Sequence, residues 1–546
     1  TESAISARAL NAQFLGGPAT ISVATRGDGT IAVNAHGTAS AAQIPRVWGE
    51  PLLRRVSGAA AWQGTLTGGR GRPLTLTVQS QLSGVAADLP PPLGKTAVEP
   101  MALRFERVTS AKPARTDTIK VSLDRSVDAI IQRRLEGPGY VVDRGVISLN
   151  QPAVLPDREG LSVTGSLPYV DVDRWRELLG GEDGTGSPFS SALDVKIAAL
   201  DFGGRRLNDV SLRAGTSGSV WIANVSAREL AGEIAWRPEG RGRIVARLKH
   251  FNLPESTPGK TVEAPTRDLP ALDIISDNLI VNDKDLGRLE LVAVNQALDW
   301  NIEKLVLTAP ESALTVTEGV WQGRALKPSV NLKKISLEVN DVGKFLERMG
   351  YPGTVRRGTA TLTGSLSWAG NPQSIDYPTL SGNLDFEAKK GQFLKAEPGV
   401  ARLIGILSMQ SWLTLDFREL FGRGFAFDLV SCNADIASGT MTTQNFHMKG
   451  PSAQVSMEGK VDLVNETQDL HARVEPSVGD SISAIVLVAV NPVWGLGALI
   501  LDKILKNPFG QALAFEYRVT GTWANPIPER LKADVRSTEA PPQSVP

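Results

Sequence analysis

The sequence of 546 residues contains few cysteines and histidines. Its one cysteine, Cys432, excludes an internal disulfide and any zinc site built from several cysteines. We interpret Cys432, in the segment LVSCNADI, as a buried strand residue. The four histidines, His36, His250, His447 and His471, include no pair at the spacing of metal ligands. The sequence therefore predicts no metal site and no cofactor.

An excess of charge of one sign is also absent, as are the common catalytic motifs. Lys and Arg number 58, and Asp and Glu number 58, so the formal net charge is zero and no basic block favours nucleic acid. There is no HExxH, GxSxG or Walker loop, and no GxGxxG that opens a helix. We therefore predict a protein that is not an enzyme. A polysaccharide-cleaving enzyme stays open as an alternative, because sequence alone cannot pair distant carboxylates.

Turn residues and short alternating segments are abundant instead, with Gly 53 and Pro 34. In 360–368, Leu362 and Leu366 alternate with polar residues, and in 453–463, Val455, Met457 and Val461 do the same. A period of two predicts strands with one apolar and one polar face. It favours antiparallel pairing, because buried parallel strands are apolar on both faces.

Internal repeats are visible by direct alignment. One alignment of the chain with itself places Leu193 on Leu272 and Trp221 on Trp300, and it matches units near 193–236 and 272–321. A second alignment places DVDRWRELLG at 171–180 on DVGKFLERMG at 341–350. A Thr-Gly-Ser or Thr-Gly-Thr signature recurs in several strands, and glycine inside a strand usually marks a bulge or bend. The repeats predict a repetitive, curved β-sheet.

Helices are predicted to be few and short. The candidate helices lie at 44–56, 127–135, 171–180, 341–350 and 399–412, with two more beginning at 482 and 496. The candidate linkers lie at 111–116, 182–188 and 254–270. The residues after 531 carry no periodicity, and we expect them to be disordered.

The longest apolar stretch, 482–501, contains only Ser483 and Asn491 as polar side chains. A run of this length is normally a candidate transmembrane helix, but Pro492 near its middle would break such a helix. We therefore predict a helical hairpin over 482–505, packed on the sheet or dipping into a membrane. The residues assigned to its apolar surface are Ile485, Leu487, Val493, Trp494, Leu496 and Ile500.

A curled sheet with one polar face must cover or use its apolar face. It either closes into a dry core, or stays open as an apolar groove that suits acyl chains. We assign the groove lining to Leu362, Leu366, Val455, Met457 and Val461. Periodicity alone does not separate this groove from a filled β-solenoid that acts as a spacer.

Several segments resemble YhdP-type AsmA-like proteins of Gram-negative envelopes. They include VQSQLSGVAADLPPPLGKTA at 78–97, GLSVTGSLPYVDVDRW at 160–175 and LGRLELVAVNQALDWNIEKLVL at 286–307. The segment GQFLKAEPGVARLIGILSMQSW at 391–412 and those at 417–451 and 475–526 are similar to that family as well. The resemblance implies the carboxyl-terminal part of a long periplasmic β-groove, whose full-length protein is anchored in the inner membrane. The implied activity is non-enzymatic passage of phospholipid between the inner and outer membranes.

The resulting prediction is a mostly β protein, a long curved antiparallel sheet that forms an apolar groove with a few short amphipathic helices. We divide the chain into a β-groove segment at 1–180, a repeat segment at 181–350, a carboxyl-terminal segment at 351–531 and a disordered tail at 532–546. The expected partners are phospholipid acyl chains, with membrane contact at the carboxyl-terminal end. Because the chain begins at Thr1 without a methionine, signal peptide or anchor, we expect a fragment or a processed chain. The runner-up functions are an envelope spacer and an enzyme acting on envelope polysaccharide.

Overall fold

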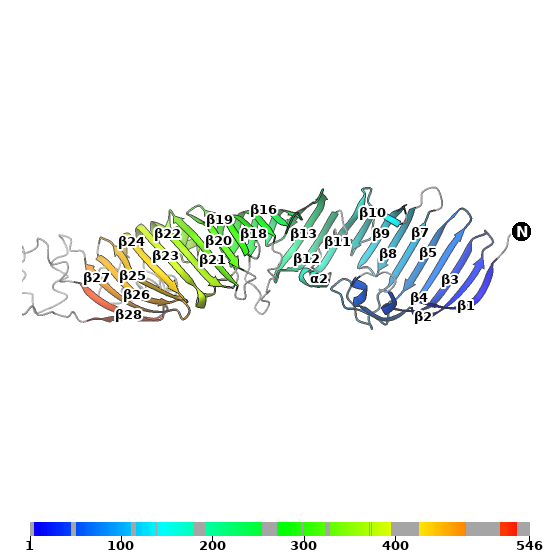
Figure 1. Cartoon of the computed structure of the whole chain (residues 1–546), viewed down its shortest axis with the longest axis horizontal. Helices are drawn as coiled ribbons and strands as arrows, with labels where there is room; N and C mark the ends of the chain where they lie inside the picture. The colour runs from blue at the N-terminus through cyan, green and yellow to red at the C-terminus, as the bar shows by residue number, and fades with distance from the viewer. Residues whose placement is uncertain are drawn as a thin grey trace, which may run out of the picture. The chain divides into compact units, whose positions relative to one another are not determined.

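A computed structural model describes most of the chain, and it forms two compact units, Thr1–Ala264 and Pro265–Pro546. The described residues are 5–44, 51–110, 116–137, 139–178, 192–253, 270–296, 299–322, 328–370, 372, 374–394, 425–451, 453–476 and 514–531. Within each unit the strands follow one another side by side in chain order (Figure 1).

The first unit contains strands β1 to β16. Their bounds are β1 Ser6–Phe14, β2 Gly17–Thr25, β3 Ile31–Ser40, β4 Val56–Gly69, β5 Arg72–Ser80, β6 Val85–Ala87, β7 Leu103–Thr109, β8 Thr116–Leu123, β9 Val127–Glu136, β10 Gly139–Leu149, β11 Gly160–Asp171, β12 Ala192–Phe202, β13 Arg205–Ser217, β14 Val220–Ser226, β15 Leu230–Arg237 and β16 Arg243–Leu253. Each strand pairs with the next, except that β5 pairs with β7 while the short β6 pairs with the start of β4.

Pairing in the first unit is antiparallel except at β10, β11 and β12, which pair in parallel. The predicted sheet is mostly antiparallel, and these two parallel pairings are exceptions that the alternation does not indicate. Parallel neighbours need a crossover connection rather than a tight turn. Residues 150–159 connect β10 to β11, and the connection from β11 to β12 begins with helix α2, Val172–Leu178.

The second unit contains strands β17 to β29, and every pairing in its described part is antiparallel between consecutive strands. Their bounds are β17 Ala271–Val281, β18 Lys284–Gln296, β19 Asp299–Ala309, β20 Ser312–Gln322, β21 Ser329–Val339, β22 Val355–Ala369, β23 Ser381–Phe393, β24 Phe425–Ala437, β25 Thr440–Lys449, β26 Ala453–Asp462, β27 Thr467–Pro476, β28 Phe515–Gly521 and β29 Pro526–Arg530. The prediction of a mostly β, predominantly antiparallel protein with few helices is confirmed.

The helices in the described part of the chain are short. They are α2, α3 Val342–Arg348, and the 3-10 helices η1 Ala41–Gln43, η2 Pro51–Arg55 and η4 Tyr377–Thr379. The side chain of Asp341 caps α3 by accepting a hydrogen bond from the backbone N–H of Lys344 at 3.0 Å. None of these helices has the length and apolar composition needed to cross a bilayer.

One predicted helix is wrong, because 127–135 forms strand β9. The segment has Asp128 near its start and Arg133 and Arg134 near its end, which is the charge distribution that stabilises a helix dipole. Pairing decides the outcome, since β9 is hydrogen-bonded to β8 on one side and to β10 on the other.

The other predicted connections have mixed outcomes. The predicted helices at 171–180 and 341–350 are confirmed as α2 and α3. Of the predicted helix at 44–56, residues 45–50 lie outside the described residues, 51–55 form η2, and Val56 already belongs to β4. The helix at 399–412, the hairpin at 482–505, the tail and nearly all of the linkers lie outside the described residues.

The internal repeats correspond to repeated strands. In the alignment that places Leu193 on Leu272, the bounds of β12 and β13 coincide with those of β17 and β18. In the alignment of 171–180 with 341–350, α2 coincides with α3. The signature glycines also have a structural reason. Gly165 and Gly364 have φ values of +125° and +154°, and an added Cβ would lie within 2.1 Å of a carbonyl oxygen on the neighbouring strand. The division into three segments stays a prediction.

Candidate functional site

One face of the first unit carries an unbroken row of apolar or glycine residues that runs across the strands. Residues that are directly opposite in neighbouring strands point to the same face of a sheet, so the pairing register defines the row. We call it the central row. From β2 to β9 it consists of Ile21, Ala35, Gly64, Val78, Phe105, Val121 and Ala129.

The central row continues through the parallel strands without losing register. From β10 to β16 it consists of Ile147, Val163, Leu193, Ala214, Ala223, Ile234 and Ala246. Only Ala129 and Ala246 are buried, at 7% and 3% exposure, and the other members are all partly exposed. The described part of the protein therefore covers this apolar row only in part.

The adjacent row on the opposite face is polar at every strand. Its members, each next in sequence to a member of the central row, are Thr20, His36, Gln63, Gln79, Arg104, Ser122, Asp128, Ser148, Thr164, Asp194, Arg213, Asn224, Glu233 and Arg247. We call the two sides the apolar face and the polar face. A one-residue change in register would exchange them, so the pattern fixes the register strongly.

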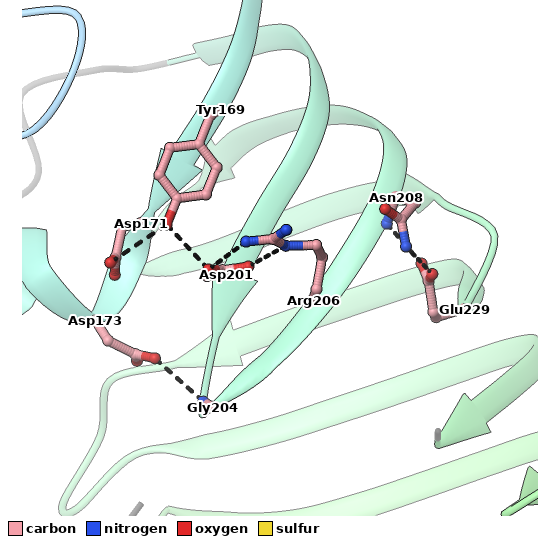
Figure 2. Close-up of polar contacts among 8 residues, drawn as sticks. All are labelled: Tyr169, Asp171, Asp173, Asp201, Gly204, Arg206, Asn208 and Glu229. Atoms are coloured by element: carbon pink, nitrogen blue, oxygen red, sulfur yellow. Dashed lines mark hydrogen bonds and ion pairs between the residues drawn. The ribbon is translucent and has the colours of Figure 1, made fainter. Parts of the chain in front are cut away.

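A polar cluster lies on the apolar face at the edge of the sheet that carries α2, which we call the helix margin (Figure 2). Asp201 accepts hydrogen bonds from Tyr169 Oη at 2.9 Å and from Arg206 Nε and Nη2 at 2.7 and 3.0 Å. Burial and the Asp201 carboxylate raise the pKa of Tyr169. These bonds join β11, β12 and β13 and end the apolar surface on this side.

Two further contacts secure the helix margin. Asp173 of α2 accepts hydrogen bonds from the backbone N–H groups of Gly203 and Gly204, in the turn between β12 and β13. Figure 2 shows the contact with Gly204. Glu229 accepts hydrogen bonds from the backbone and side-chain nitrogens of Asn208 at 2.7 and 2.6 Å. Since each carboxylate satisfies backbone or amide donors at a turn, these groups have a structural role.

A second charged cluster lies on the apolar face toward the opposite edge, which we call the far margin. Asp117 of β8 accepts hydrogen bonds from Arg107 Nε of β7 at 2.8 Å and from Arg133 Nε and Nη2 of β9 at 2.8 and 2.6 Å. The Asp117 side chain has no exposed surface. Burial would raise its pKa, but the hydrogen bonds and charges of the two arginines outweigh burial and lower it.

In the second unit, the five predicted lining residues all lie on one face. Leu366 and Val461 belong to one row, through Gly382, Ile436 and Met441. On β22, Leu362 has the same strand phase as Leu366, and on β26, Val455 and Met457 have the same phase as Val461. The structure therefore gathers these residues on a shared apolar face.

Burial divides these five residues into two groups. Leu362 and Leu366 are half-buried, whereas Val455, Met457 and Val461 are only 2%, 7% and 1% exposed and belong to a large core cluster. Cys432 lies on strand β24 as predicted, but it is half-buried rather than fully buried, and burial raises the pKa of its thiol. Contact of the five lining residues with acyl chains stays a prediction, and the burial makes Leu362 and Leu366 the more accessible pair.

The apolar hairpin lies outside the described residues, as do Ile485, Leu487, Val493, Trp494, Leu496 and Ile500. The strands before and after it are described, and β27 pairs with β28 through Val474 and Phe515. The end of β27 and the start of β28 therefore lie beside each other at one margin of the sheet. Its contact with a membrane stays a prediction.

Neither the cluster at the helix margin nor the cluster at the far margin was predicted from the sequence. Arg107 has the same strand phase as Phe105, and Asp117 has the same phase as Ile119 and Val121. A charged residue at a position where alternation expects an apolar one could therefore have indicated the cluster at the far margin. Arg133 could not be recognised in this way, because its segment is predicted as a helix and the alternation of a strand was not applied to it.

The fold and these surfaces define a class of protein: a repetitive β-sheet with an apolar face, which in the first unit is continuous across the strands and limited at its margins by paired charges. Such a surface suits apolar chains better than a small polar substrate. In the part of the chain that the structure describes, no group of His, Cys, Asp and Glu side chains could hold a metal ion.

Comparison with known proteins identifies the family. The chain belongs to the YhdP protein family, whose model matches residues 1–527. It is 23% identical over 518 residues to the intermembrane phospholipid transporter YhdP of Escherichia coli (strain K12), an alignment that covers 91% of this chain. The chain spans about 40% of the length of that relative. No solved structure was found to match it.

Proposed function

We propose that this chain is part of a non-enzymatic conduit for phospholipid between two membranes. The observation that carries the proposal is the central row, which stays apolar from β2 to β16 while the adjacent row on the other face is polar throughout. The relative in E. coli, whose name describes intermembrane phospholipid transport, supports the same function for this chain.

The energetics of acyl chains suit such a surface. Moving one methylene group from water to an apolar surface gains about 0.8 kcal/mol when it is fully buried. Because equivalent apolar positions recur at each strand, about 4.8 Å apart, a chain that moves by one strand exchanges one set of contacts for a similar set. Repetition therefore favours retention of lipid without one deep binding minimum.

The same proposal assigns roles to the predicted site residues. Leu362 and Leu366 contact acyl chains in the second unit, whereas Val455, Met457 and Val461 belong to the core cluster against which Leu366 packs. The hairpin residues Ile485, Leu487, Val493, Trp494, Leu496 and Ile500 contact a membrane at the carboxyl-terminal end. The chain works in the periplasm, and the full-length protein is anchored in the inner membrane.

A spacer with a filled core is the second candidate, and one observation favours it locally. Val430, Met448, Val455 and Val474 are each no more than 3% exposed, so this part of the second unit is already filled by its own side chains. If the whole protein were a spacer, the central row of the first unit would need a covering segment of protein rather than lipid.

The test is lipid extraction and native mass spectrometry of the chain purified from a Gram-negative host. Val78 lies in the central row and Gln79 lies beside it in the polar row, so Val78→Asp and Gln79→Asp form a matched pair on β5. We expect phospholipid to co-purify with the wild type and with Gln79→Asp, and to be largely lost from folded Val78→Asp. Leu366→Asp extends the test to the second unit.

The outcome separates the two candidates. A folded wild-type protein that carries no phospholipid and takes up no fluorescent acyl lipid would overturn the conduit and favour the spacer. Equal lipid in Val78→Asp and Gln79→Asp would show that the lipid does not lie on the central row.

A further inference from the structure

The far-margin cluster is a charged exception on an otherwise apolar face. Arg107 is registered between Leu76 and Ile119, in the row next to the central row. Asp117 and Arg133 are registered with each other in the following row. These side chains therefore border the apolar surface directly, at the side away from α2.

The cluster carries one more positive charge than negative charge, because two arginines share one aspartate. Asp117 is fully buried, while Arg107 and Arg133 keep 37% and 24% of their side-chain surface exposed. A positive charge beside apolar surface is costly unless an anion or water satisfies it. The structure thus has a net cation at the boundary between the apolar surface and the margin.

The arginines also retain hydrogen-bond donors. Each guanidinium has five N–H groups, and the bonds to Asp117 use one from Arg107 and two from Arg133. Among the described residues, neither guanidinium has another hydrogen-bond acceptor. Paired guanidinium groups with remaining N–H donors suit phosphate oxygens, because several charge-assisted bonds can form at once.

Tyr140 of β10 supports this arrangement. Its ring centre lies 5.4 Å from the guanidinium carbon of Arg107 and 4.8 Å from that of Arg133. Contact of both cations with one aromatic ring restrains their positions before any ligand arrives. A purely structural ion pair would need only one arginine for Asp117, whereas this cluster positions two.

We propose that Arg107 and Arg133 bind the phosphate group of a phospholipid whose acyl chains lie on the central row. Asp117 orients both arginines, and Tyr140 restrains them. Asp117 and Val121 lie on the same strand, β8, about 13 Å apart if the strand is extended. A head group at the cluster therefore leaves room for acyl chains to cross the central row. The inference rests on the proposed conduit and adds a head-group site to it.

The test compares two fluorescent lipids with identical acyl chains, a phosphatidylglycerol and a diacylglycerol that lacks the phosphate. The variants are Arg107→Gln, which leaves the Asp117–Arg133 pair intact, and Arg107→Lys, which keeps the charge. The matched control is Arg104→Gln, on the same strand but on the polar face, where Arg104 pairs with Glu106 at 3.1 Å. Equal diacylglycerol binding in all variants establishes that the apolar surface is intact.

We expect the wild type to bind phosphatidylglycerol at least about tenfold more tightly than diacylglycerol, as lost charge-assisted hydrogen bonds would predict. Arg107→Gln should lose most of this preference, Arg107→Lys should keep part of it, and Arg104→Gln should keep all of it. Equal affinity of the wild type for both lipids, or an unchanged preference in Arg107→Gln, would overturn the head-group site while the conduit stands. Failure to bind either lipid would instead reject the conduit.

Free phosphate is the other source of the same chemistry, and competition distinguishes it. Millimolar inorganic phosphate that leaves the lipid preference unchanged identifies the lipid head group as the ligand. Phosphate that abolishes the preference, and that binds the wild type but not Arg107→Gln by phosphorus NMR, assigns the cluster to free phosphate and overturns the lipid assignment.

Discussion

The central row of the first unit and the β21–β27 row of the second unit are built alike but are covered differently. We call the row of the second unit the buried row, and it runs through Val339, Ala360, Ala388, Val430, Met448, Val455 and Val474. All of its members are at most 9% exposed, whereas most members of the central row are partly exposed. Alternation places apolar residues on one face in both units, but it does not decide whether that face is covered.

The size of the neighbouring side chains accounts for part of the difference. Around the buried row the core contains Phe425, Phe427, Phe446, Met441 and Tyr517, which can span the space above a curved sheet. The central row contains several alanines and no methionine. The large side chains of the core cluster help to cover the apolar face of the second unit.

The largest expected difference comes from placing one charge in the core cluster of the second unit, to which Val461 belongs, and another in the central row of the first unit. Val461→Asp, at a position that is 1% exposed, should lower the local free energy of unfolding of β26 by about 3–5 kcal/mol, because the carboxylate would be buried without a partner. Val78→Asp should cost about 1 kcal/mol or less, because water reaches that side chain. Hydrogen exchange measured by mass spectrometry checks both. Equal protection of β26 in Val461→Asp and wild type would contradict the dry core.

A smaller difference is expected from truncation. Met448→Ala should destabilise the second unit by about 2–5 kcal/mol through the cavity that it leaves. Val121→Ala removes part of a half-exposed side chain and should cost about 0.5–1 kcal/mol. Local unfolding free energies from hydrogen exchange compare the two. Equal costs would remove the distinction between the rows.

The far-margin cluster predicts a pH-dependent contribution of intermediate size. The pKa of Asp117 is lower in the folded protein than in the unfolded chain, so its stabilising effect is present above the unfolded value of about 3.9 and is lost as pH falls through the folded value. At neutral pH, Asp117→Asn should destabilise β7 to β9 by about 2–3 kcal/mol. The difference from wild type should shrink below about pH 4. A difference that stays constant under acid conditions would refute the ionised pair.

The smallest effect is expected at an exposed ion pair on the second unit. Arg518 Nε and Nη2 donate to Asp469 at 2.9 and 2.8 Å, and these bonds lower the pKa of Asp469. Both side chains are more than half exposed, so solvent screens the pair. Arg518→Gln should leave hydrogen exchange in β27 and β28 unchanged within error. A clear loss of protection would show that this exposed ion pair stabilises β27 and β28, contrary to the expectation.

Much of the fold could be predicted because strand periodicity is a local property. The alternation around Leu362 and Val455 predicted the apolar face, and the match of 171–180 to 341–350 predicted helices α2 and α3. The parallel pairing of β10 to β12 could not be predicted, since it depends on where two crossover connections return the chain. The Arg107, Asp117 and Arg133 cluster required the register of three strands, one of which had been predicted as a helix.

Photo-crosslinking along adjacent residues tests the central claim most directly. A photoreactive amino acid is introduced at Val78, Phe105 or Val163 in the central row, and at the neighbouring Gln79, Arg104 or Thr164 in the polar row. We expect lipid crosslinks at the central-row position of each pair and none at the polar-row position, so that crosslinking alternates along each strand. Crosslinks of equal yield on both faces, or at no central-row position in a folded protein, would contradict it.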